Sequence, residues 1–166
     1  MRLRPVGLVG VAALLILAAV ALLWPRPWLV VRHDGVIRAA FAGGEGARFA
    51  LRWTHSVEKE AWIEAFVVRD GAIELVSTRF KTFGAGVPAA AGRRTTLEDG
   101  WVVMHDIHRI VDPLAVQAAA AEDYSLRHDG HWHALSTPGK KPILVIENRR
   151  LPLYRVLPAL IARCSG

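Results

Sequence analysis

Residues 61–80 read AWIEAFVVRDGAIELVSTRF, two runs of β-prone side chains separated by the pair Asp70-Gly71. An Asp-Gly pair between such runs is the strongest short-range signal for a β-hairpin, because both residues tolerate the positive φ angles of a type I′ turn. Three further Asp-Gly pairs occur in similar settings, at 34–35, 99–100 and 129–130. The sequence therefore predicts antiparallel sheet structure.

The same pattern extends along the chain from residue 29. Phe49 and Leu51 alternate with Arg48 and Arg52, as expected for a strand with one buried and one solvated face. We predict a mainly β fold, a small antiparallel β-sandwich or partly open barrel with one short helix, preceded by a single N-terminal transmembrane or signal helix. The predicted strands lie near 29–33, 36–41, 47–55, 61–69, 72–80, 101–110, 124–128, 131–135 and 143–147.

Three segments do not show this strand pattern. Residues 112–122 favour the short helix, because Asp112 suits the N-cap position and Pro113 the first helical position. Residues 81–94 are rich in Gly and Pro and predict a long ordered loop. Residues 151–162 are apolar but contain two prolines, which argues against a second membrane helix, and we expect this segment to cover the edge of the core.

The N-terminal segment has a different character. Val6 to Trp24 contains no charged side chain and follows Arg2 and Arg4, and as a helix it reaches roughly 29 Å, enough to cross a bilayer core. We interpret residues 1–28 as an uncleaved membrane anchor and residues 29–166 as an extracytoplasmic β-rich domain, facing the periplasm or cell exterior. The alternative is a signal peptide cleaved after Ala19-Val20-Ala21, which would release the domain into the periplasm.

Charge and cysteine content exclude several classes of protein. The net charge is +6, and half of that excess comes from Arg2, Arg4 and Arg26 around the apolar run, so the domain itself has no nucleic-acid-binding footprint. Cys164 is the only cysteine, which excludes an intramolecular disulfide, a Cys-x-x-Cys metal knuckle and a redox pair. We expect no cofactor.

Two segments resemble a known bacterial family. Residues 52–59, RWTHSVEK, followed by Trp62, Glu64 and Phe66, and residues 80–88, FKTFGAGVP, are similar to the domain of unknown function 1850 family. The similarity extends loosely over residues 29–147. It implies a small envelope protein whose gene lies beside, or is fused to, TAXI-type TRAP transporters, which take up small organic acids. No reaction is implied.

The resemblance therefore implies an accessory role in transport. The implied partners are the TRAP transporter membrane subunit or its substrate-binding protein, together with the cytoplasmic membrane. We expect a non-catalytic protein that contacts a transport component or binds a small organic anion. The alternative is a metal-dependent or hydrolytic envelope enzyme.

The candidate site is a basic cluster at the strand ends around the two signature segments. Its cations would hold a carboxylate by charge-assisted hydrogen bonds, and two glycines would add free backbone N–H groups. The alternative is that the cations pair with Glu58, Glu60 and Glu64 on a solvated sheet face. The candidate ligand- or partner-binding residues are Arg52, His55, Ser56, Lys59, Glu64, Arg79, Lys81, Gly84 and Gly86.

Histidines raise the question of catalysis. His105 and His108 are three apart on a strand and point to opposite faces, so they would not share a metal ion. The alternative metal candidates, at one hairpin, are His128, His131 and His133. No cysteine accompanies them, and no clear carboxylate is present to orient the rings, so we expect no metal. In the hydrolytic alternative, Ser56 would be the nucleophile, His55 the base, and Glu58 or Glu64 the orienting acid. Neighbouring side chains on a strand point in opposite directions, so His55 would not easily activate Ser56.

Overall fold

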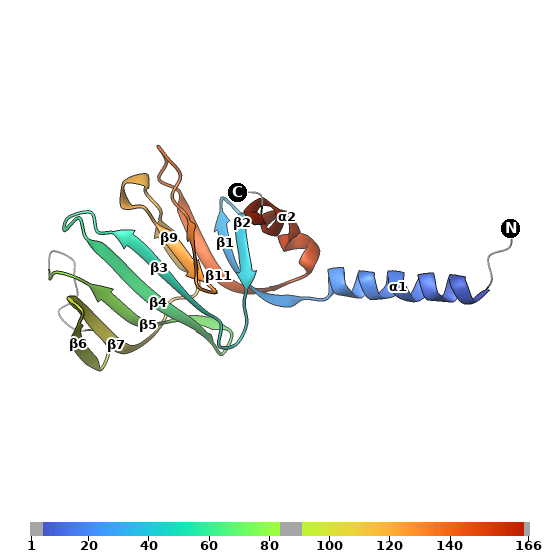
Figure 1. Ribbon diagram of the computed structural model, residues 1–166, viewed down its shortest axis with the longest axis horizontal. Coiled ribbons are helices and arrows are strands. Elements are labelled where there is room, and N and C mark those ends of the chain that lie inside the picture. Colours follow the sequence, from blue (N-terminus) through green and yellow to red (C-terminus); the bar gives the residue numbers. More distant parts are fainter. Residues whose placement is uncertain (1–4, 84–90, 165–166) are drawn as a thin grey trace.

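The computed structural model describes residues 5–83 and 91–164, which form two antiparallel sheets with a long helix projecting from one end (Figure 1). One sheet has four strands, in the order β2 (Val36–Ala42), β1 (Arg26–His33), β11 (Ile143–Leu151) and β8 (Leu114–Gln117). The other has seven strands, in the order β10 (His131–Ala134), β9 (Ser125–His128), β3 (Arg48–Thr54), β4 (Ala61–Arg69), β5 (Ala72–Phe80), β7 (Trp101–Ile110) and β6 (Arg94–Glu98). Over the described ranges the sheets stay separate and do not close into a barrel.

The Asp-Gly pairs form the turns that the sequence predicts. Asp70 and Gly71 have φ angles of 53° and 79°, and the other three pairs have the same two positive angles. Each pair joins neighbouring antiparallel strands: β1 to β2, β4 to β5, β6 to β7 and β9 to β10. Local turn chemistry thus accounts for four of the strand pairings.

The main core lies between the two sheets. Leu29 and Ile146 of the four-stranded sheet meet Leu51 and Phe66 of the seven-stranded sheet, and each of these side chains is at most 2% exposed. The Phe49 ring stacks on the Phe66 ring with centroids 4.8 Å apart. The alternation along β3 thus places its apolar residues in the core, and the predicted mainly β fold is confirmed.

A helix covers the other face of the four-stranded sheet. In α2 (Leu153–Cys164), Val156 and Ala159 pack on Val30 and Ala40. Burial from both sides explains why β1 contains consecutive buried residues instead of an alternating pattern. The segment expected to cover the core edge therefore lies over the β1–β2 side of the sheet face, as a helix that accommodates Pro158.

The helix predicted over 112–122 is wrong. Leu114–Gln117 forms strand β8, which pairs with Ile143–Ile146 of β11, and the helical part is only a 3-10 turn, η1 (Ala120–Glu122). The Asp112 carboxylate accepts a hydrogen bond from the Ile73 backbone N–H across the structure, so it caps no helix. Pairing with β11 buries apolar surface that an isolated helix would leave exposed, and this outweighs local helix propensity.

Residues 81–83 and 91–93 of the predicted loop lie outside the strands, and Arg94 at its end begins β6. Strand β6 (Arg94–Glu98), which pairs with β7, was not predicted. Gly84, Gly86 and the rest of residues 84–90 lie outside the described residues.

Helix α1 (Pro5–Leu23) extends away from the sheets (Figure 1). Its large apolar side chains are exposed, for example Leu14 at 68% and Leu17 at 65%. Among the residues that the structure describes, no helix is long and apolar enough to cross a membrane.

Candidate functional site

The outer face of the seven-stranded sheet, the face turned away from the four-stranded sheet, gathers arginines. Because Phe49 and Leu51 point into the core, Arg48 and Arg52 of β3 point outward. Ile63 of β4 lies opposite Arg52 on one side and opposite Arg79 of β5 on the other. Directly opposed residues share a face, so both arginines flank Ile63 on this outer face.

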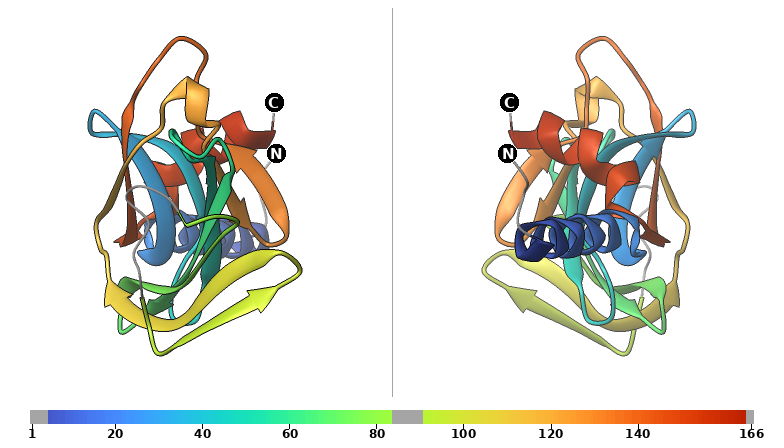
Figure 2. Two further views of the ribbon diagram at one scale, coloured as in Figure 1. Left: turned by 90° about the vertical axis from the view of Figure 1, so that its left-hand side faces the viewer. Right: turned by 90° about the vertical axis from the view of Figure 1, so that its right-hand side faces the viewer.

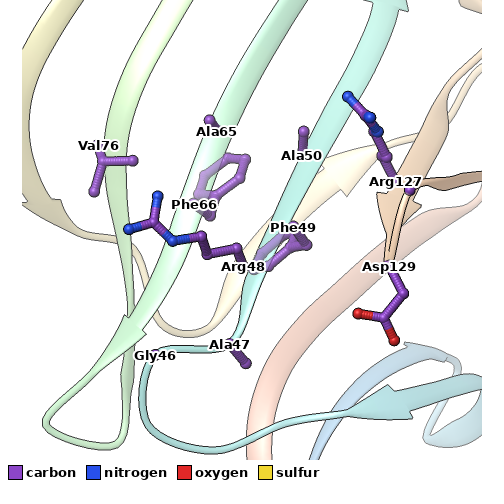
Figure 3. Close-up of a pocket in the computed structure, with 11 residues that line it drawn as sticks. Gly46, Ala47, Arg48, Phe49, Ala50, Ala65, Phe66, Val76, Arg127 and Asp129 are labelled. Atoms are coloured by element: carbon purple, nitrogen blue, oxygen red, sulfur yellow. The ribbon is translucent and has the colours of Figure 1, made fainter.

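Next to these residues on the outer face, two alanines lie beside a further arginine. Ala50 of β3 lies opposite Ala65 of β4 on one side and opposite Arg127 of β9 on the other. A cavity of about 500 Å³ opens here, and in Figure 3 the methyl groups of Ala50 and Ala65 lie between the Arg48 and Arg127 guanidiniums. It is lined by Gly46, Ala47, Arg48, Phe49, Ala50, Ala65, Phe66, Val76, Arg127, Asp129 and Gly130.

A second cavity, of about 270 Å³, adjoins the first and shares Ala50, Ala65 and Arg127 with it. Arg79 and Trp132 line its further walls. We call the two adjoining cavities, together with Arg48, Arg52, Arg79 and Arg127, the arginine groove.

Tryptophan rings position three of these guanidiniums. The Arg52 guanidinium carbon lies 4.5 Å from the centroid of the Trp132 ring, and that of Arg127 lies 5.9 Å from the same ring. The Arg79 guanidinium carbon lies 5.1 Å from the Trp101 ring centroid. A ring face attracts the cation without neutralising it, and a stacked guanidinium keeps its N–H edges available.

Among the described residues, two carboxylates, those of Asp129 and Glu98, line the groove, but neither forms an ion pair with its arginines. In residues 5–83 and 91–164, none of its four arginines forms an ion pair. Asp129, on one wall, instead lies 3.1 Å from Nδ1 of His128. Glu98 lines the second cavity, where hydrogen bonds from Thr96 and then His105 lower the pKa of its carboxyl. Both acids thus already have partners of their own.

The structure places the described site residues in three positions: on the outer face, in a loop and on the inner face. Arg52 and Arg79 lie on the outer face. Lys81 lies with Nζ 5.5 Å from the centroid of the Trp101 ring, and it also lines a small cavity with His55. His55, Ser56 and Lys59 lie in the loop between β3 and β4.

The loop residues have local structural contacts. The ring of His55 stacks on the Trp62 ring at 5.5 Å, and its Nδ1 accepts a hydrogen bond from the Glu58 backbone N–H at 3.3 Å. Lys59 adopts a φ of 56° and donates its N–H to the His55 carbonyl. These contacts tie the loop to the strand ends and leave it apart from the groove.

Glu64 lies on the opposite, inner face of the sheet, directly across from Leu51. Burial raises the pKa of this carboxyl, and the positive charge of Arg109 partly opposes that effect. Glu64 is therefore on the wrong side of the sheet to pair with Arg52 or Arg79.

The contacts of the described candidate histidines do not assemble a metal site. His128 Nε2 hydrogen-bonds to the Ala42 carbonyl oxygen at 2.8 Å, and the ring of His133 packs against Phe41. No group of three or more potential metal ligands occurs in the part of the chain that the structure describes. His105 and His108 contact different glutamates, Glu98 and Glu74.

Sequence reasoning missed Arg48, Arg127 and Trp132. Alternation within the strands already places both arginines on solvated faces. Arg48 precedes the buried Phe49 in β3, and Arg127 lies between two buried residues in β9. No local signal shows, however, that β9 pairs with β3 and so brings Arg127 and Trp132 to the same surface.

These features define a class: a two-sheet β protein with a groove of arginines on the outer face of its larger sheet. The sequence profile of the family described as Domain of unknown function (DUF1850) matches residues 49–135, more than half of the chain. The chain belongs to this family. The matched range contains nearly all of the seven-stranded sheet, including Arg52, Arg79 and Arg127. No curated protein and no solved structure matches the chain.

Proposed function

We propose that this protein is a non-catalytic accessory protein that binds a small organic anion of the carboxylate class in the arginine groove. The observation that carries the proposal is the set of four guanidiniums on one open sheet face, without carboxylate partners among the described residues. Guanidinium N–H groups match a carboxylate in shape and charge, and such bonds are about twice as strong as neutral ones.

The dimensions of the groove fit a small ligand. The cavity of about 500 Å³ is in the range of small-molecule sites, and the adjoining one adds about 270 Å³. Their walls combine apolar side chains, such as Ile63 and Val103, with the charged groups. This combination favours an organic anion with an apolar part over a bare inorganic ion.

The N-terminal helix supports a tethered location. We propose that α1 anchors the protein in the cytoplasmic membrane and that the β domain lies in the periplasm or cell exterior. The support is the uncharged run from Val6 to Trp24 and the exposed apolar side chains of α1. A reporter fused after Gly166 should be active outside the cytoplasm and stay with membranes after a carbonate wash. A soluble periplasmic product with a new N-terminus at Leu22 would instead identify a cleaved signal.

The family resemblance supports a transport context. We propose that the protein serves a TAXI-type TRAP system and contacts its membrane subunit or its substrate-binding protein. A site for organic anions suits a system that takes up organic acids. Co-purification of those components with the tagged protein is the test, and their absence from the eluate under conditions that preserve the transporter would contradict it.

Calorimetric titration of the full-length protein in detergent tests the groove. The probes are succinate, glutamate and phenylacetate, with chloride as the counter-ion control. The double variant Arg52→Gln/Arg79→Gln should bind the best probe about 100-fold more weakly, because two charge-assisted hydrogen bonds are lost at about 1.5 kcal/mol or more each. Arg38→Gln, an exposed arginine on the four-stranded sheet, is the matched control. Equal weakening by both, or no saturable binding of any probe, would refute the proposal.

A further inference from the structure

The outward face of α2 is apolar, although it points away from the core. Val156 and Ala159 face the four-stranded sheet and are at most 5% exposed. On the opposite side, Tyr154 is 49% exposed, Leu157 is 38% exposed and Pro158 is also exposed. Residues at i, i+3 and i+4 lie on one helix face, so these three form a continuous apolar stripe.

This stripe lies at the end of the domain from which α1 leaves. Figure 1 shows α2 on the side of the sheets nearest to α1, and the two helices contact each other. In the right-hand view of Figure 2, seen from that side, α1 points toward the viewer and α2 lies above it. A bilayer that holds α1 would therefore lie directly in front of α2.

Arginines surround the base of α1. The Arg26 guanidinium donates to the Ala21 carbonyl oxygen at 3.4 Å, and that of Arg150 donates to the Pro25 carbonyl oxygen at 3.3 Å. Arg155 is exposed in the first turns of α2. Residues 1–33 and 148–166 contain no Asp or Glu, so these two segments contribute only positive charge.

Aromatic residues complete the surface. Trp24 directly follows α1 and is 63% exposed, and Tyr154 opens the exposed stripe of α2. Trp and Tyr are enriched where a protein meets the headgroup layer of a membrane. An apolar helix face with flanking arginines is typical of helices that lie in that layer, buried about 5–10 Å.

We infer that α2 is an interfacial helix, which lies in the headgroup layer of a bilayer containing acidic phospholipids, with Tyr154 and Leu157 inserted and Arg26, Arg150 and Arg155 on the lipid phosphates. The inference rests on the proposed anchoring of α1, because it is the same bilayer that both helices meet. It adds a function for α2: the helix fixes the orientation of the β domain on the membrane.

Fluorescence quenching in proteoliposomes of phosphatidylcholine and phosphatidylglycerol tests this inference. In a Cys164→Ser background of the full-length chain, an environment-sensitive dye is attached at Leu157→Cys, and doxyl-labelled phosphatidylcholine is the quencher. Leu97→Cys is the matched control, because Leu97 is 77% exposed in β6, at the opposite end of the molecule from α1. Leu14→Cys reports on α1 separately. Thermal melting of each labelled protein verifies that it is folded.

We expect several-fold stronger quenching at position 157 than at position 97. In pure phosphatidylcholine, or with Arg155→Gln, quenching at position 157 should decrease while that at position 14 is unchanged, since each arginine near an anionic surface adds to the attraction. Quenching at 14 but not at 157 overturns the inference and leaves the anchor intact. Protection of position 157 from aqueous iodide without lipid quenching also overturns it, because a protein, such as a second copy, then covers α2.

Two other results separate the inference from the anchor. Quenching at position 157 without quenching at position 14 supports an interfacial α2 and contradicts insertion of α1. An absence of quenching at both positions contradicts both ideas.

Discussion

The arginines of the groove and the arginines on the outer face of the four-stranded sheet have different partners. On the four-stranded sheet, which α2 covers, the Glu147 side chain is 5% exposed and takes ion pairs from Arg32 at 2.8 Å and Arg149 at 3.0 Å. On the seven-stranded sheet, the described arginines of the groove lie against tryptophans and pair with no carboxylate. Elsewhere on the seven-stranded sheet, Arg69 pairs with the buried Glu74 carboxylate at 3.1 Å.

This difference separates structural cations from binding cations. A guanidinium paired with a buried carboxylate satisfies a group that would otherwise be costly to bury. A guanidinium stacked on an indole is positioned but retains its charge and its free N–H edges. The two faces should therefore respond differently to equivalent substitutions.

The largest expected effect comes from placing a carboxylate on each face. Val30→Asp buries an unpaired charge beneath α2, opposite Glu147 in the register, and should cost about 3–5 kcal/mol of folding free energy. Ile63→Asp places the same group between Arg52 and Arg79, where it should be tolerated and should abolish anion binding. Urea denaturation measures the free energy of unfolding of both variants. An equal loss in the two would remove the distinction between the faces.

Removing one arginine from each face gives the next contrast. Arg32→Gln leaves the buried Glu147 carboxylate with only Arg149 and should cost about 1 kcal/mol, because Arg32 is itself partly exposed. Arg52→Gln should change stability by less than about 0.5 kcal/mol but weaken anion binding about tenfold. The free energy of unfolding and the dissociation constant are measured on the same samples. A larger stability loss in Arg52→Gln would reverse the assignment.

The pH dependence of stability gives a smaller contrast. Burial alone would raise the pKa of Glu147, but hydrogen bonds and charges from Arg32 and Arg149 outweigh it and hold the pKa below its ordinary value of 4.5. A carboxyl with a lowered pKa in the folded state contributes stability above its unfolded pKa and loses it as the pH falls through the folded pKa. Glu147→Gln should therefore lower the melting temperature at neutral pH, and the deficit should shrink below pH 4.5. A deficit independent of pH would exclude an electrostatic origin.

The smallest expected effect concerns the tryptophan support of the groove. Trp132→Leu removes the ring against which Arg52 and Arg127 lie and should weaken anion binding by a factor of about two, or about 0.5 kcal/mol. Trp101→Leu is the matched variant at the Arg79 side. Calorimetry on both determines whether the rings position the guanidiniums. Unchanged affinity in both variants would limit their role to packing.

The comparison also shows what sequence patterns do and do not contain. The alternation in β3 predicts that Arg48 and Arg52 are outward, since the period of side chains in a strand is a local property. Glu64, one of the signature residues, follows the same rule: it lies two residues from the buried Trp62 and Phe66, so alternation in β4 already indicates the inner face, where it lies opposite Leu51. Which strands lie next to each other is not contained in such local patterns.

The sequence by itself determined the four Asp-Gly hairpins, the alternating core positions and the separate character of the N-terminal segment, because turn angles and hydrophobic periodicity depend on neighbouring residues. Only the tertiary structure decided that residues 114–117 form a strand, that β9 pairs with β3 and that α2 packs on the four-stranded sheet. These outcomes depend on which distant segments bury each other's apolar surface. The arginine groove is a product of that long-range pairing, since β9 brings Arg127 and the β9–β10 hairpin brings Trp132 to the arginines of β3.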